Sequence, residues 1–169
     1  VERKAIIVDL GKTEAILPAR EQAPKDRYRQ GDTIRAYVLE VKMTPRGPEI
    51  ILSRVHPNLV KKLFELEVPE IHDGIVEIKA VTREAGSRTK IAVLSHDAKV
   101  DCVGSCVGMR GSRVKNIVNE LGGEKIDIVR WSPDQETFIR NALSPAELGH
   151  IKLYPSEQRA DITASDDQL

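Results

Sequence analysis

At 169 residues, the chain is long enough for one large domain or two to three small ones. Hydrophobic residues make up 40% and charged residues 31%, and no apolar run approaches the roughly 20 residues that a membrane span needs. The net charge of zero excludes a wholly electrostatic, histone-like binder. Residues 1–54 nevertheless hold 11 basic and 8 acidic side chains, whereas residues 132–169 hold 3 and 7. A nucleic acid is therefore expected to favour the first two-thirds of the chain, which starts at Val1 and is expected to be a fragment.

The first 54 residues are predicted to form β-structure. Residues 5–10 and 13–17 have strand composition and are separated by a short gap, which predicts a hairpin. After a polar loop, Gly31-Asp32 opens a long strand from Thr33 to about Met43, in which apolar and polar residues alternate. A turn at residues 45–48 leads to a short strand at 49–54. Four antiparallel strands in so few residues predict a small barrel that lacks most of its first strand.

The period of the apolar residues changes after His56-Pro57, where a helix is predicted. Its apolar residues fall on one side at helical spacing: Leu59, Val60, Leu63, Phe64 and Leu66. Two strands are predicted next, from Gly74 onward and at residues 89–94, with a turn at 85–88. A short helix at 102–107, a glycine loop, a longer helix that stops at Gly122-Gly123 and a strand at 125–131 complete the unit. The predicted order is helix, strand, strand, helix, glycine loop, helix, strand.

The same order begins again after residue 131. Ser132-Pro133 is predicted to cap a helix, with Gln135 placed for a capping box. Strands are predicted at residues 150–154 and 159–164, joined by a turn, and residues 166–169 are typical of the start of another helix. We interpret residues 132–169 as a second unit that is cut off before its own glycine loop.

The tetrapeptide Gly108-Met109-Arg110-Gly111 is the sharpest candidate for a binding site. A lone GxxG pattern is weak, but here it joins two helices within a unit that has the element order of a KH domain. Glycine lets the backbone approach a ligand closely, and the start of the next helix directs N–H groups toward an anion. KH domains clamp about four nucleotides of single-stranded backbone with such a loop. The loop therefore predicts contact with single-stranded RNA or DNA. Four neighbouring residues are also predicted to contact the nucleic acid: Val107, Ser112, Arg113 and Lys115.

An apolar groove for the bases is expected beside this loop. The candidates for its wall, each of which could equally be a core residue, are Val103, Val107, Ile117 and Ile126 or Ile128. No aromatic residue lies near the loop in the sequence. Base recognition is therefore expected to rest on backbone hydrogen bonds and apolar contact.

A second nucleic-acid surface is predicted on the β-rich segment. OB barrels bind single strands with basic and aromatic side chains on one face of the sheet. The candidates are Arg35, Tyr37, Lys42, Arg46 and Arg54, with Arg27, Tyr28 and Arg29 from the preceding loop. Each of them alone could be an ordinary solvated residue, but their combined positive charge favours a nucleic-acid face.

No pattern in the sequence predicts a catalytic centre, a metal site or a cofactor. The four histidines are dispersed, and there is no GxSxG, Walker or HExxH motif. Cys102 and Cys106 lie four residues apart, where a disulfide would close almost no loop. We expect them to be reduced and partly buried, which is consistent with a cytosolic protein.

Several stretches resemble the NusA family of bacterial transcription elongation, termination and antitermination factors. Residues 31–38 (GDTIRAYV) and 50–54 (IILSR) resemble an OB barrel of the ribosomal protein S1 type. The stretch from residues 86–90 (GSRTK) to 107–114 (VGMRGSRV) resembles the first KH domain of NusA. The linking residues 64–71 (FELEVPEI) are also similar to this family.

The resemblance implies an α+β multidomain protein. Its expected parts are a partial OB-fold barrel at 1–54, a type II KH domain (α-β-β-α-α-β) at 55–131 and a truncated second KH domain at 132–169. It implies a monomeric, non-enzymatic, cytoplasmic factor that binds nascent single-stranded RNA beside bacterial RNA polymerase and antitermination factors. Such a factor modulates pausing, termination and antitermination. The alternatives are an OB–KH subunit of an RNA-degradation complex, such as an exosome cap protein, and a scaffold that contacts only proteins.

Overall fold

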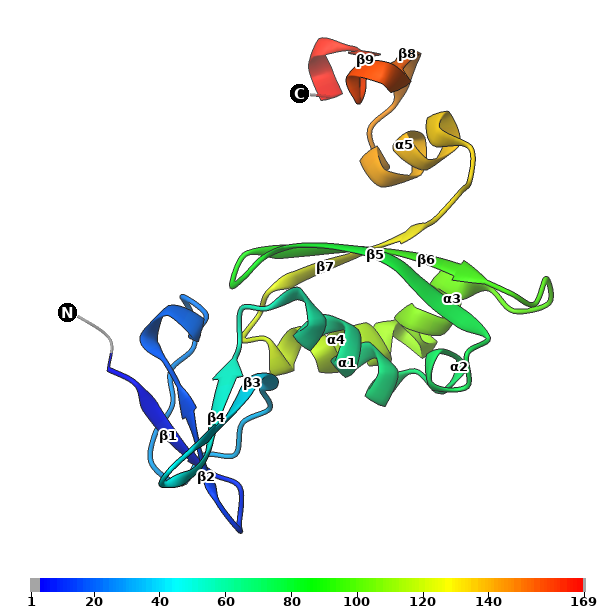
Figure 1. Ribbon diagram of the computed structural model, residues 1–169. Helices are drawn as coiled ribbons and strands as arrows, with labels where there is room; N and C mark the ends of the chain where they lie inside the picture. Colours follow the sequence, from blue (N-terminus) through cyan, green and yellow to red (C-terminus); the bar gives the residue numbers. More distant parts are fainter. Residues whose placement is uncertain (1–3, 169) are drawn as a thin grey trace.

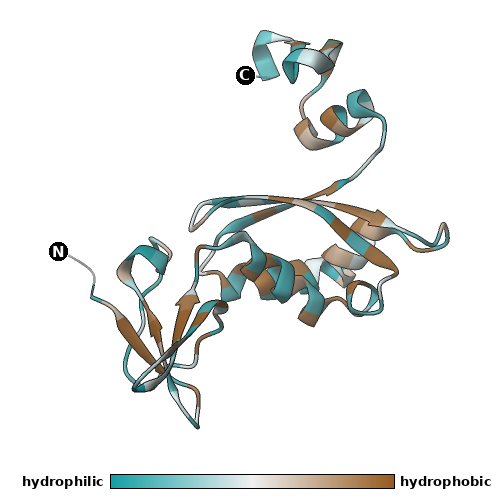
Figure 2. Cartoon of the chain, in the orientation of Figure 1, coloured by the Kyte–Doolittle hydropathy of each residue, from teal (hydrophilic) through white to brown (hydrophobic). Residues whose placement is uncertain are grey.

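The computed structural model describes residues 4–168 and shows three consecutive parts (Figure 1). A β-sheet lies at the N-terminal end, a helix-covered sheet at the centre, and a helix with a β-hairpin at the C-terminal end. Figure 2 shows apolar residues concentrated in the N-terminal strands and on the helices that cover the central sheet. The predicted class, mixed α and β in separate parts, is confirmed.

The N-terminal sheet contains β1 (Ile6–Asp9), β2 (Glu14–Leu17), β3 (Tyr37–Thr44) and β4 (Gly47–Ser53) in the order β1-β2-β4-β3. The predicted hairpin of β1 and β2 is present, but the prediction of four antiparallel strands is wrong, because β2 and β4 pair in parallel. The reason is the long connection between β2 and β3, which lets β4 return beside β2 in the same direction. β1 and β3 remain edge strands, so the barrel is open between them.

The third strand is shorter than the sequence predicts, because the residues before β3 are irregular. β3 begins at Tyr37 rather than Thr33. Ile34 and Ala36 pack against the small core of the sheet, around Leu17 and Leu52, without joining a neighbouring strand. The alternation of apolar and polar residues before β3 therefore reflects burial of every second side chain against this core. An irregular segment can bury alternate side chains without pairing as a strand.

The central part has the predicted element order. It comprises α1 (Pro57–Glu67), α2 (Pro69–His72), β5 (Val76–Glu84), β6 (Arg88–Ser95), α3 (Cys102–Val107), α4 (Ser112–Glu120) and β7 (Lys125–Arg130). Two short elements were not predicted: the four-residue α2, which Pro69 starts at its first turn, and a 3-10 turn at Met109–Gly111 within the glycine loop. The sheet order is β5-β6-β7, with β5 and β6 antiparallel and β6 and β7 parallel.

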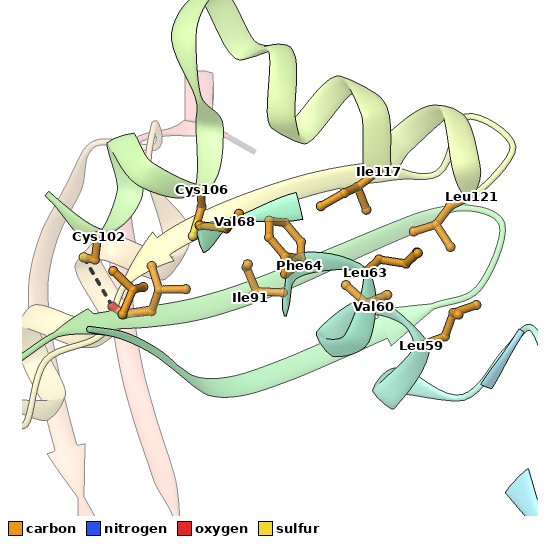
Figure 3. Packing of buried hydrophobic residues seen from close by; sticks show 12 residues of the cluster. Leu59, Val60, Leu63, Phe64, Val68, Ile91, Cys102, Cys106, Ile117 and Leu121 are labelled. Carbon is orange, nitrogen blue, oxygen red and sulfur yellow. Dashed lines mark hydrogen bonds between the residues drawn. The ribbon is translucent and has the colours of Figure 1, made fainter. Parts of the chain in front are cut away.

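One face of the central sheet carries the main hydrophobic core. Phe64 of α1 is fully buried, and Ile91 of β6 and Ile117 of α4 pack into the same cluster (Figure 3). Cys102 and Cys106 are free thiols buried in this cluster, more deeply than predicted. Burial, followed by the influence of Cys102, raises the pKa of the Cys106 thiol to about 12. Both cysteines therefore serve as small core residues.

The C-terminal part contains α5 (Gln135–Leu143), β8 (Leu148–Tyr154) and β9 (Arg159–Ala164), as predicted. The predicted cap is wrong: Asp134 is the N-cap, and its carboxylate accepts from the N–H of Thr137. Aspartate is as strong an N-cap as serine. Because Asp134 and not Ser132 takes this position, the helix starts two residues later than predicted. Residues Asp166–Gln168 form a single 3-10 turn, and Leu169 of the predicted next helix lies outside the described residues.

α5 lies on the face of the central sheet opposite to α1 and α4 (Figure 1). The ammonium of Lys90 in β6 donates to the carbonyl of Ala142, in the last turn of α5. Asn141 donates through Nδ2 to the carbonyl of Arg130, at the end of β7 (3.0 Å). These polar contacts fix α5 beside the edge strand of the sheet.

Candidate nucleic-acid interface

The loop between α3 and α4 is a tight turn with an unusual backbone. Gly108, Arg110 and Gly111 all have positive φ angles (74°, 54° and 75°). The N–H of Gly111 donates to the carbonyl of Gly108 (3.0 Å), which closes the turn. Met109 projects from it with 84% of its surface exposed, and Arg110 is also exposed. The two middle residues of the loop thus face solvent at the start of α4.

Arg113 supports this loop from behind. A Cβ placed on Gly108 would lie 2.7 Å from Cγ of Arg113, so glycine is needed at this position for space as well as for φ. The guanidinium of Arg113 donates from Nη1 to Glu70 (2.9 Å) and to the carbonyl of Ser105 (2.7 Å). It thereby ties α4 to α2 and α3, and a direct contact of Arg113 with a ligand stays a prediction.

Arg110, Lys115 and Ser112 are the remaining polar candidates at the loop. Within residues 4–168 the guanidinium of Arg110 makes no hydrogen bond or ion pair. Lys115 donates to the backbone carbonyl of Arg110 (3.2 Å) and stays exposed, as does Ser112. No side chain caps the N-terminus of α4, because the N-cap residue is Gly111. Positive charge and helix N–H groups therefore gather where a phosphate would meet the loop.

A groove of about 370 Å³ runs beside the loop along the edge strand β7. Three of the predicted wall residues line it, namely Val107, Ile126 and Ile128. Ile117 does not, because it is buried in the core, and Val103 packs against that core as well. The residues that the sequence did not indicate as part of the groove are Lys90, Val114, Asp127, Val129, Arg130, Asn141 and Ser144.

Of the groove residues that sequence reasoning missed, Val114 could have been found and Asn141 could not. Val114 is an apolar residue that follows the glycine loop by only three positions, so its place beside the loop can be read from the sequence. Asn141 belongs to α5, and only the packing of α5 beside β7 brings it to the groove. The groove is therefore built by the central part and the C-terminal part together.

On the N-terminal sheet, the predicted basic face is only partly assembled. Arg35 is exposed before β3, Lys42 is exposed on β3, and Arg46 is exposed in the turn before β4. Lys42 makes a surface ion pair with Glu40 (3.3 Å). Tyr37 is half-buried: its ring stacks on His56 with centroids 4.9 Å apart, and its hydroxyl accepts from Asn58 (3.2 Å). This aromatic ring packs against the central part rather than projecting as a platform for bases.

Arg54 lies in the interior, contrary to the prediction that it contributes to an exposed basic face. Its side chain is 3% exposed, and its guanidinium forms two hydrogen bonds with the carboxylate of Asp26 (2.9 and 3.2 Å). It also donates to the carbonyls of Arg35 and of Glu120, both at 2.8 Å. Because Glu120 ends α4, Arg54 joins the N-terminal sheet to the helix that begins at the glycine loop.

A second buried ion pair stabilises the central part near this junction. Glu124 is fully buried and accepts from Arg83 (2.9 and 3.0 Å), from Thr89 (2.5 Å) and from the N–H of Gly86 (2.8 Å). Burial alone would raise the pKa of Glu124, but the bonds from Arg83, Thr89 and Gly86 outweigh it and lower that pKa. Arg83 also donates to the carbonyl of His56 (3.0 Å), just before α1.

Neither a metal site nor a membrane-spanning helix is found among the described residues. Within residues 4–168 no group of three or more His, Cys, Asp or Glu side chains could hold a metal ion. Among the same residues, no helix has both the length and the apolar character that crossing a membrane requires.

A β-sheet of barrel type, followed by a helix–glycine loop–helix motif beside a groove lined by both apolar and polar side chains, is typical of modules that bind single-stranded nucleic acid. Comparison with known families agrees with this class. Residues 1–54 match the S1 RNA binding domain, and residues 54–131 match the NusA-like first KH domain.

Comparison with individual curated proteins identifies the family. It is 53% identical to the transcription termination/antitermination protein NusA of Halalkalibacterium halodurans over 99% of its own length and 44% of that protein. It is 52% identical to the NusA of Bacillus subtilis over 100% of its length and 46% of that protein. It is 46% identical to the NusA of Thermus thermophilus over 98% of its own length and 43% of that protein. The chain belongs to the NusA family, and it spans less than half the length of these relatives.

Proposed function

We propose that the chain binds single-stranded RNA, with the phosphates at the Gly108–Gly111 loop and the bases in the groove along β7. The observation that carries this proposal is the position of the open, positively charged loop beside a groove at a sheet edge, where apolar side chains could contact the faces of bases and polar ones their edges. A KH clamp of this kind holds about four nucleotides. No covalent chemistry is needed for this action, so the chain acts by binding and not as an enzyme.

The biological role that we propose follows from the relatives. They are named transcription termination/antitermination proteins, which makes nascent RNA the natural ligand. The chain would then act in the bacterial cytoplasm as a monomer, beside RNA polymerase and antitermination factors, and modulate pausing, termination and antitermination. Family membership favours this role over that of an exosome cap protein.

Residues 132–169 are, in this proposal, the beginning of a second KH domain. α5, β8 and β9 follow one another as α1, β5 and β6 do in the first. The residues that follow Leu169 in the full-length protein provide the test. A second GxxG loop between two helices soon after it supports the proposal, and a sequence without one overturns it.

A double substitution tests the RNA clamp. Met109→Asp together with Arg110→Asp places two negative charges where phosphates would bind, at exposed positions that the core does not need. We expect at least a tenfold loss of affinity for a single-stranded RNA of about four nucleotides, measured by fluorescence anisotropy, with an unchanged unfolding midpoint.

The matched control is Lys62→Asp together with Leu66→Asp on α1. It makes the same change in charge at two exposed positions, one basic and one apolar, on another helix. The control should bind RNA as the parent does. Equal affinity of the parent and the loop variant would contradict the proposed clamp.

A further inference from the structure

An open cleft of about 570 Å³ lies where the N-terminal sheet meets the central part. Residues from three separate segments line it: Thr33, Ile34 and Arg35, Glu67 at the end of α1, and Asn116, Asn119 and Glu120 on α4. We call this site the junction cleft. Its volume lies within the range of small-molecule pockets and is sufficient for a nucleotide.

The junction cleft is held in shape by contacts that involve its own walls. Arg54, beneath it, binds the backbone carbonyls of two lining residues, Arg35 and Glu120. The guanidinium of Arg54 also lies 3.5 Å from the carboxylate of Glu120. On the other side, Nδ2 of Asn116 donates to Glu67 (2.7 Å). The two walls therefore keep a fixed spacing without a ligand, which lowers the entropic cost of binding.

A row of exposed polar side chains connects the clamp to this cleft. Ser112, Lys115, Asn116 and Asn119 are all exposed on α4, at spacings of three and four residues that place them on one side of the helix. The row starts at the glycine loop and ends in the cleft. α4 is nine residues long, which corresponds to about 14 Å.

We propose that the junction cleft binds a base of the same single-stranded RNA that the clamp holds, on the segment that runs along α4. This inference rests on the proposed function, since it requires RNA at the clamp. It adds a subsite that recognises bases outside the groove of the KH domain.

The chemistry of the lining selects a base rather than a phosphate. Glu67 and Glu120 bring negative charge, which Arg35 and the buried Arg54 offset. The side-chain amide of Asn119 makes no hydrogen bond within the described part of the chain, so it offers both a donor and an acceptor. Amides recognise the edges of unstacked bases in this way, whereas a phosphate would favour unopposed cations.

Length-matched RNAs test the subsite in the intact chain. The probes are a tetranucleotide that fills the clamp and RNAs that extend it by about four nucleotides on the 5′ or the 3′ side. We expect one of the two extensions to bind more tightly than the tetranucleotide. Asn119→Ala should weaken binding of that RNA by about 3- to 10-fold, which is the effect of one lost hydrogen bond. It should leave binding of the tetranucleotide unchanged.

Alanine is a better helix former than asparagine, so Asn119→Ala does not endanger α4. The control is Gln135→Ala, which removes an exposed amide from α5 and should bind every probe like the parent. Since the cleft contacts a base, the gain from extension should add little to the dependence of affinity on salt.

Three results would overturn the inference: no gain from either extension, an equal effect of Asn119→Ala on all probes, or a gain that salt abolishes. A parent chain that fails to bind even the tetranucleotide would instead refute the proposed function itself.

Discussion

Gly108 shows how a single residue links the fold to the binding loop. Its φ of +74° and the side chain of Arg113 behind it both exclude a Cβ. We expect Gly123→Ala, at φ +90° in open space, to cost about 1–2 kcal/mol of unfolding free energy from backbone strain alone. Gly108→Ala should cost at least about 1 kcal/mol more, because Arg113 must also move. Urea unfolding of the two variants measures the difference, and equal losses would contradict this account of Gly108.

Glu124 carries a prediction about pH. Since folding lowers its pKa below the ordinary 4.5, its contribution to stability is present above that value and is lost as the pH falls through the lowered pKa. Glu124→Gln should therefore lose about 3–5 kcal/mol near neutral pH, because Arg83 stays buried without a counter-charge. The loss should shrink toward pH 3. Unfolding midpoints measured across this range test the sign, and a difference that does not depend on pH would refute it.

At the scale of elements, α5 tests which residue caps a helix. Asp134 accepts from the N–H and the hydroxyl of Thr137, whereas Ser132 accepts only from the N–H of Asp134. Asp134→Ala should speed amide hydrogen exchange in residues 135–143 several-fold, as expected for a lost cap. Ser132→Ala should change it much less. A larger effect of Ser132→Ala than of Asp134→Ala would instead support Ser132 as the cap, as the sequence predicted.

The sequence predicted the elements whose signal is local. The spacing of Leu59, Leu63 and Phe64 fixes α1, and the GxxG pattern between two helices identifies the loop. The parallel pairing of β2 with β4 was not predictable in this way, because it depends on the path of a long connection. The same holds for Asn141, which reaches the groove only through the packing of α5.

At the scale of the whole molecule, Arg54 joins two parts that the sequence treats separately. An arginine in a β-rich nucleic-acid module is expected at the surface, and nothing local marks Arg54 as buried. Its partners Asp26 and Glu120 lie 28 and 66 residues away, so only the folded chain brings them together. Its hydrogen bonds consequently hold the segment before β3 against the end of α4, at the junction cleft.

Arg54→Met should destabilise the chain by about 3–5 kcal/mol, since it leaves Asp26 buried without its counter-charge. The control, Arg20→Met, removes a surface pair with Glu21 (3.8 Å) from a side chain that is 81% exposed, and should cost less than about 1 kcal/mol. Chemical denaturation measures both values. A loss of similar size in the two variants would mean that Arg54 does not hold the junction.

The central claim is that RNA binds at the Gly108–Gly111 loop and the adjacent groove. An NMR titration of the isotope-labelled chain with a single-stranded tetranucleotide tests it most directly. We predict that the amide shifts concentrate at residues 107–115 and in β7, with small effects in β3 and β4. Shifts confined to β3 and β4, with the loop unchanged, would contradict the claim and assign RNA binding to the N-terminal sheet.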